Sequence, residues 1–247
     1  MISMKRSAWF ALVLALISAS ATSVAQVQDE ATLADNKIHL EFMPYLIAPG
    51  MGGDVTVNGT TETLNASAGD VLSHLQFGFM ARTGISYNRL FVGTDTVYMG
   101  LGGANDAVDV GFDQWAAELL GGYRVHPRIS LLGGVRYNSL SANLKFKGPL
   151  ESNIRGSQVW WDPFFGAVGN IPLGKKLSAS TRFDIGGFGA GSQIAVNAEP
   201  LLNYQFTRRF MGTVGWKFLY QDYVNKGQAF EYDVLTQGPV LGLAIRW

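Results

Sequence analysis

From residue 37 to the C-terminus, apolar and polar residues alternate with a period of two in ten successive segments. In the first segment, Ile38, Leu40 and Phe42 fall on one face and the residues between them on the other. Successive side chains of a β-strand point to opposite faces, so the pattern predicts strands with one apolar and one mixed face. The predicted strands cover residues 37–48, 76–87, 90–100, 113–125, 129–142, 158–171, 177–187, 193–206, 210–221 and 233–247.

An outward apolar face on every strand requires an apolar surrounding. Hydrophobic residues make up 47% of the chain and charged residues only 15%. No stretch after the N-terminus approaches the roughly 18–20 apolar residues of a membrane helix. Lipid cannot satisfy the backbone groups of an open sheet edge. The sequence therefore predicts an all-β fold, a closed antiparallel transmembrane β-barrel of ten strands, with eight or twelve strands as alternatives.

The connections between the predicted strands alternate in length. Short turns fall at residues 88–89, 126–128, 173–176 and 207–209, and longer connections at 49–75, 101–112, 143–157, 188–192 and 222–232. Short periplasmic turns with longer external loops are typical of outer-membrane barrels. In the longest loop, residues 54–57 and 60–64 are predicted to form a hairpin about Asn58-Gly59, and residues 69–75 a short helical turn. This loop is a candidate cap for the barrel mouth.

The N-terminus has the features of a secretory signal peptide. Lys5 and Arg6 precede an apolar core at residues 8–17, and small residues follow. Ser23-Val24-Ala25 predicts cleavage before Gln26, with residues 19–21 as the alternative site. The rival interpretation is an uncleaved anchor, for which the apolar core is too short. We therefore divide the chain into a cleaved signal peptide (1–25), a periplasmic N-terminal segment (26–36) and an outer-membrane barrel (37–247). The chain contains no cysteine, which excludes disulfides.

Alternation assigns the charged residues of the strands to the lumen. An Arg or Lys facing lipid at mid-membrane would cost about 2–4 kcal/mol. Six acids and six bases fall on the inward face, and their balance predicts ion pairing in a narrow lumen. The alternative interpretation is a wet lining that conducts small ions or solutes. The predicted lumen charge network comprises Glu41, Asp95, Glu118, Asp162, Asp184 and Glu199 with Arg82, Arg124, Arg136, Arg182, Lys217 and Arg246.

Aromatic residues of the strands are candidates for the belts that barrels place at the membrane interfaces. The candidates are Tyr45, Trp115, Tyr123, Trp161, Tyr204, Trp216 and Tyr220.

The sequence offers few candidate catalytic residues. His74 is the only one of the three histidines near the predicted external mouth, and Ser73 and Asp70 lie close to it in sequence. Neighbours in sequence do not by themselves make a catalytic triad, and solvated loop residues are the simpler interpretation. We predict no catalytic, cofactor-binding or metal-binding residues and therefore no enzyme activity. The formal net charge of zero gives no sign of nucleic-acid binding.

The C-terminal strand resembles the terminal-strand signature of bacterial outer-membrane proteins, which the barrel-assembly machinery reads. Leu243, Ile245 and Trp247 would form this assembly signal, although the family usually ends in Phe. The chain as a whole resembles a family of small, functionally uncharacterised proteobacterial outer-membrane barrels. The residues that carry the resemblance are Pro44-Tyr45-Leu46, Phe77-Gly78-Phe79-Met80, Asp162-Pro163-Phe164 with Gly166, Asp184 with Gly186-Gly187-Phe188, and Gly238-Pro239 with Gly242.

The resemblance implies a fold and a location in the Gram-negative envelope, and no activity. The partners it implies are outer-membrane lipid and lipopolysaccharide, the barrel-assembly machinery and periplasmic chaperones. Three functional hypotheses follow. The first is a non-catalytic barrel with a structural or envelope-stress role, the second a narrow porin-like channel, and the third a surface enzyme or adhesin that acts through loop 49–75.

Overall fold

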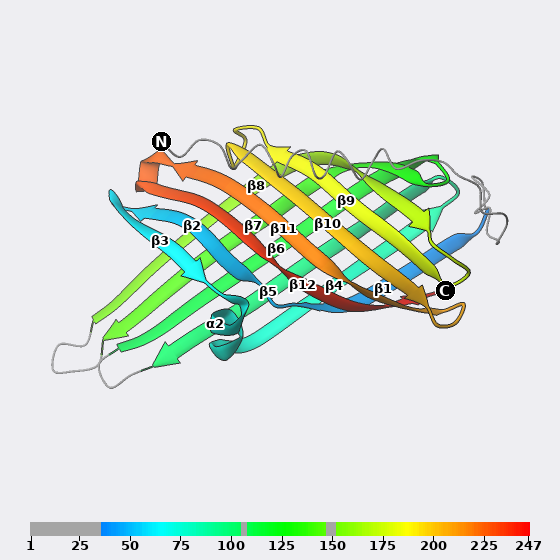
Figure 1. The fold of residues 1–247 in the computed structure, drawn as a ribbon. Coiled ribbons are helices and arrows are strands. Elements are labelled where there is room, and N and C mark those ends of the chain that lie inside the picture. The colour runs from blue at the N-terminus through cyan, green and yellow to red at the C-terminus, as the bar shows by residue number, and fades with distance from the viewer. Residues whose placement is uncertain (1–35, 105–107, 147–151) are drawn as a thin grey trace, which may run out of the picture.

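The computed structural model describes residues 36–104, 108–146 and 152–247 (Figure 1). The predicted signal peptide and residues 26–35 of the predicted periplasmic segment lie outside the described residues. Within the described ranges, no helix has the length and apolar character needed to cross a membrane. The strands are β1 Ile38–Ile47, β2 Gly50–Val57, β3 Thr60–Ala66, β4 Leu75–Tyr87, β5 Leu90–Ala104, β6 Val108–His126, β7 Ile129–Phe146, β8 Ser152–Pro172, β9 Leu177–Gly187, β10 Ile194–Gln205, β11 Phe210–Asn225 and β12 Phe230–Arg246.

Ten of these strands close into an antiparallel barrel, which confirms the predicted fold class. Strands β4 to β12 follow one another in chain order, and β1 joins β4 on one side and β12 on the other. At the closing seam, the Leu40 and Trp247 backbones exchange hydrogen bonds of 3.1 and 3.0 Å. A closed wall leaves no strand edge with unpaired backbone groups in the lipid, which could not form hydrogen bonds to them.

Strands β2 and β3 form a hairpin that continues β1 outward along the edge of β12 (Figure 1). β12 pairs with β1 through residues 240–246 and with β2 through residues 230–237. The hairpin turns at Asn58-Gly59, where both residues have positive φ, as a two-residue turn of this type requires. The short helix α2 Ala68–Ser73 follows, with the Ser67 side chain as its N-cap. The predicted hairpin and helical turn are therefore both present.

Three of the longer connections were predicted wrongly. Residues 101–112, 143–157 and 222–232 are mostly strand, because β5 to β8, β11 and β12 extend beyond the membrane as paired hairpins (Figure 1). Their glycines and polar residues have a turn-like composition. Antiparallel partners nevertheless supply the backbone hydrogen bonds outside the lipid as well as inside it.

The outer wall of the barrel carries exposed apolar side chains all the way round. Leu119, Phe165, Val214 and Leu241 are each more than half exposed. This surface is the lipid-facing belt that alternation predicted. Tyr45 is an exception to the predicted aromatic belt: it is 3% exposed and points into the lumen, because it shares the inward register of Met43 on β1.

Candidate functional site in the barrel interior

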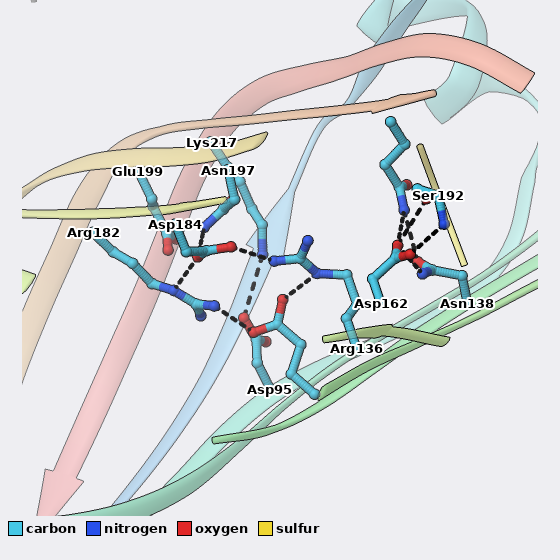
Figure 2. Close-up of polar contacts among 12 residues, drawn as sticks. Asp95, Arg136, Asn138, Asp162, Arg182, Asp184, Ser192, Asn197, Glu199 and Lys217 are labelled. Carbon is cyan, nitrogen blue, oxygen red and sulfur yellow. Dashed lines mark hydrogen bonds and ion pairs between the residues drawn. The ribbon is translucent and has the colours of Figure 1, made fainter. Parts of the chain in front are cut away.

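The barrel interior contains two neutral groups of buried ion pairs. The first is a closed ring in which Arg136 and Arg182 alternate with Glu118 and Asp184. Arg136 Nε lies 2.7 Å from Glu118 Oε1, and Arg136 Nη2 lies 2.8 Å from Asp184 Oδ1. Arg182 Nε donates to Asp184 Oδ2 at 2.8 Å, and its Nη2 lies 2.8 Å from Glu118 Oε2 as an ion pair without hydrogen-bond alignment. Figure 2 shows both guanidinium groups converging on Asp184.

The phenyl group of Phe164 packs against the two arginines of this ion-pair ring. The Phe164 side chain on β8 is buried, and the guanidinium carbons of Arg136 and Arg182 lie 5.1 and 5.2 Å from its ring centroid. Cation–π contacts of this length are favourable when the cation is desolvated. Asn197 Nδ2 also donates to Asp184 Oδ2 at 2.8 Å. The ring is therefore fixed from several strands at once.

The second group lies beside the first and is centred on Asp95. Arg82 Nε donates to Asp95 Oδ2 at 3.0 Å, and Arg82 Nη2 contacts both Glu199 oxygens at 2.7 and 2.8 Å. Lys217 Nζ lies 3.3 Å from Asp95 Oδ2, and the Tyr45 hydroxyl donates to Asp95 Oδ1 at 2.6 Å. Two bases face two acids here as well, so the buried charge is compensated.

Asp162 is a buried carboxylate of a different kind, because its hydrogen-bond donors are neutral. Its Oδ1 accepts from the Ser192 backbone N–H at 2.6 Å, and its Oδ2 accepts from the Ser192 hydroxyl at 2.9 Å. Asn138 Nδ2 and Trp160 Nε1 each donate to Oδ2 at 3.1 Å, and Gln221 Nε2 lies 3.4 Å away. Ser192 belongs to the external turn between β9 and β10, so Asp162 anchors that turn to the barrel interior (Figure 2).

The remaining predicted lumen charges lie near the periplasmic ends of the strands. Arg246 Nε contacts Glu41 Oε2 at 2.6 Å across the closing seam, and each side chain is about 40% exposed. Arg124 is half-buried two residues before the turn at His126 and stands apart from the ion-pair groups. Nine of the twelve predicted residues thus come together in the interior and three do not. The nine are Arg82, Asp95, Glu118, Arg136, Asp162, Arg182, Asp184, Glu199 and Lys217.

Sequence reasoning missed the neutral partners of these charges. Asn138, Trp160 and Asn197 each lie two residues from a predicted lumen charge and share its inward register, which is a signal that could have found them. Ser192 lies in a turn, where alternation carries no information about direction.

Two apolar clusters fill the interior around the charges. Beside the Asp95 group, along β1, β4, β5 and β12, lies a methionine-rich cluster, which comprises Met43, Tyr45, Ile47, Met80, Met99, Val240 and Ala244. Toward the outside, the inner face of the β2–β3 hairpin packs on the outer halves of β7, β8 and β11. This second cluster comprises Met51, Leu140, Trp160, Tyr223, Phe230, Tyr232 and Val234. Trp160 and Tyr223 stack at its centre, with centroids 4.3 Å apart.

A cavity of about 40 Å³ lies beside the ion pairs, large enough for one or two water molecules. Asp95, Gln114, Glu118, Arg136 and Lys217 line it together with apolar residues of β1 and β5. Three atoms of these lining side chains have no hydrogen-bond partner in the described part of the chain: Arg136 Nη1, Gln114 Oε1 and Glu118 Oε2. They supply a donor and two acceptors, which suits a small neutral group such as water.

The residues at the external mouth do not form a catalytic triad. The Asp70 carboxylate accepts from the Ser67 backbone N–H and hydroxyl at 2.8 and 2.6 Å, and so caps α2. His74 Nδ1 lies 2.8 Å from the Asp70 backbone carbonyl oxygen. The carboxylate therefore contacts Ser67 and does not orient the imidazole. Its two hydrogen bonds from Ser67 lower the pKa of Asp70.

Comparison with known proteins found distant solved structures and no relative in sequence. No protein-family model matches the chain, and no curated protein matches it in sequence. One similar solved structure is Ail, the attachment invasion locus protein of Yersinia pestis, with 13% identity and a TM-score of 0.41 over 85% of this chain and 98% of that one. A second is the translocator domain of the autotransporter NalP from Neisseria meningitidis, with 13% identity and a TM-score of 0.42 over 98% and 94%. A third is Neisserial surface protein A, with 12% identity and a TM-score of 0.33 over 84% and 96%.

These neighbours are outer-membrane β-barrels of Gram-negative bacteria. The closed wall, the apolar belt and the short turns on one side place this chain in the bacterial outer membrane as an integral barrel.

Proposed function

We propose that this protein is a non-catalytic outer-membrane barrel whose interior is closed, with a structural role in the envelope. The observation that carries the proposal is the filling of the interior by side chains. Buried ion pairs occupy the middle, the methionine-rich cluster packs beside them, and the cluster around Trp160 and Tyr223 lies on their external side. The cavity beside the ion pairs has room for one or two water molecules and not for a hydrated ion.

The alternative of a narrow channel requires a continuous wet path, and the ion pairs oppose one. Arg136 is 1% exposed and is held by two carboxylates on different strands. Opening a path past this residue would separate buried charges, which is strongly unfavourable. The charges therefore serve to close the lumen rather than to line a pore.

Single-channel recording of the refolded mature protein in a planar bilayer tests the proposal. We expect a silent bilayer from protein whose insertion is verified by heat-modifiable migration on a gel. Discrete current steps that change when Glu118 or Arg136 is neutralised would overturn the closed-lumen proposal. Arg246→Ala is the matched control, because it removes an arginine from the exposed periplasmic end.

The structural role is tested in cells. A strain without the protein is expected to take up more of a hydrophobic dye through its outer membrane, and the wild-type gene should restore the barrier. A deletion strain with unchanged dye uptake, detergent resistance and vesicle release would refute a structural role and leave the closed fold intact.

A further inference from the structure

A polar groove lies on the outward face of β6, β7 and β8, on the part of these strands beyond the membrane. Its volume is about 340 Å³, within the range of small-molecule binding sites. Asp113, Ser141, Asn143, Arg155 and Ser157 contribute the polar side chains. The groove is separate from the interior charges and does not depend on the proposed function.

The strand register assembles this groove. Asp113, Ser141 and Ser157 stand opposite one another across the three strands, and Asn143 stands opposite Arg155 in a second row. All five share the outward register of Trp115, Tyr137 and Trp161, so their side chains leave the barrel wall rather than enter it. The Tyr98 hydroxyl donates to Asp113 Oδ1 at 2.8 Å and so fixes the carboxylate at one end.

An aromatic platform lies directly below the groove. Trp115 and Tyr137 meet edge to face with centroids 5.3 Å apart, and Tyr137 meets Trp161 at 4.9 Å. Trp115 and Trp161 are 46% and 56% exposed on the outer wall. Exposed tryptophan and tyrosine side chains of a barrel mark the membrane interface, which here is the outer one.

The height of the groove follows from strand geometry. Along β6, Asp113 lies two residues beyond Trp115, and along β8, Arg155 lies six residues beyond Trp161. A strand tilted by about 40° climbs roughly 2.5 Å per residue. The polar side chains therefore lie about 5–15 Å outside the aromatic belt, beside the headgroup layer of the outer leaflet.

We propose that this groove binds the core sugars of an outer-leaflet glycolipid. Hydroxyl, carboxylate, amide and guanidinium groups are the donors and acceptors that sugar hydroxyls pair with, and the aromatic faces below suit the lipid-proximal sugar ring. Arg155 and Asp113 balance each other in charge, so the groove favours sugar hydroxyls over a phosphate cluster, which would call for several cations. The acyl chains of the same lipid lie against the apolar belt below.

Native mass spectrometry of the refolded protein in nanodiscs tests the proposal. The probes are rough lipopolysaccharide with its inner-core sugars, lipid A without core sugars, and phosphatidylethanolamine–phosphatidylglycerol alone. We expect retained lipopolysaccharide on the wild type and about tenfold weaker retention for the double variant Asn143→Ala/Arg155→Ala. Lys176→Ala, which removes a base from a periplasmic turn, is the matched control and should retain lipopolysaccharide fully.

A second variant guards against a folding defect. Ser157→Phe fills the groove from an exposed position without removing a charge, and it should displace the glycolipid while the barrel remains heat-modifiable. Equal retention by all variants would show adventitious annular lipid and overturn the proposal. Retention of lipid A as strong as that of lipopolysaccharide would exclude the core sugars as the recognised group and overturn it as well.

Discussion

Arg136 and Asp184, 48 residues apart in the chain, meet at 2.8 Å between Nη2 and Oδ1 in the middle of the barrel. The first is on β7 and the second on β9, so the contact spans the inner face of β8. Both side chains are almost fully buried. A buried pair of this kind contributes less through its own attraction than it costs when one partner is removed.

Replacing Arg136 is therefore expected to be among the most damaging single changes in the interior. Arg136→Ala leaves Glu118 and Asp184 with one cation, Arg182, and should lower the free energy of unfolding by about 3–5 kcal/mol. Urea titration of the protein in lipid vesicles, followed by tryptophan fluorescence, measures this loss. Arg246→Ala is the control, since its pair with Glu41 is about 40% exposed and should be worth no more than about 1 kcal/mol. If both variants lost the same free energy of unfolding, burial would not be what makes the Arg136 ion pairs important for stability.

Replacing Asp162 is expected to release the external turn between β9 and β10 without opening the barrel. Asp162→Ala removes both acceptors of Ser192, and an unsatisfied buried donor costs about 1–3 kcal/mol. Hydrogen exchange of the Ser192 amide should accelerate roughly tenfold or more, while amides of β9 and β10 keep their protection. Asp54→Asn, an exposed external carboxylate bonded to Thr63, is the control. Unchanged exchange at Ser192 would show that the turn is held by other contacts.

Alternation in the sequence predicts which face each strand residue occupies, because this depends on local geometry and on the cost of charge in lipid. The inward placement of Arg136, Asp184 and Lys217 follows from that argument alone. The pairing partners do not, because they depend on the tilt of the strands and on the stagger around the barrel. Asp95, for example, contacts Lys217 at a separation of 122 residues, a proximity that alternation does not encode.

The limits of the strands were harder to predict than their faces. Outside the membrane the lipid no longer selects apolar residues, so the alternating signal fades although the ladder continues. β8 begins at Ser152, six residues before the predicted start at residue 158. Tyr45 shows a related limit: an aromatic residue near a strand end suits an interface belt or a lumen, and only its register, shared with Met43, distinguishes the two.

An acidic pair on the external sheet predicts that the protein gains stability as the pH falls, whereas a carboxylate that is stabilised in the folded state makes it lose stability. Asp222 on β11 stands opposite Asp233 on β12, outside the membrane, and partial burial together with repulsion from Asp233 and Glu231 raises the pKa of Asp222. An acid whose pKa is higher in the folded state destabilises that state when it is ionised. Stability should therefore rise as the pH falls from neutral through this raised pKa, and the gain is complete below the unfolded pKa of about 3.9.

Asp222→Asn is expected to remove this effect. At pH 7 the variant should be more stable than the wild type by less than about 1 kcal/mol, because exposed charges are screened. The difference in the free energy of unfolding between the variant and the wild type should vanish near pH 3.5 and shrink in 0.5 M salt. Asp70→Asn provides the comparison: the pKa of Asp70 is lowered in the folded protein, so this substitution should reduce stability at pH 7. Urea midpoints measured at both pH values decide the point, and a variant less stable at pH 7 would show that the Asp222 carboxylate is favourable.

The terminal residue allows the assembly signal to be separated from the closing of the barrel. Trp247 closes the seam through its backbone, which exchanges two hydrogen bonds with Leu40, while its side chain is 57% exposed on the outer wall. Trp247→Ala keeps both backbone bonds, so the purified variant should refold in vesicles nearly as well as the wild type. In cells, loss of the aromatic ring should reduce the folded fraction in the outer membrane severalfold if the assembly machinery reads Leu243, Ile245 and Trp247.

Trp247→Phe should restore assembly, because it keeps an aromatic residue at the end of the strand. Deletion of residue 247 removes the two seam hydrogen bonds as well and should impair refolding in both settings. A Trp247→Ala variant that assembles normally in cells would show that the terminal ring carries no signal.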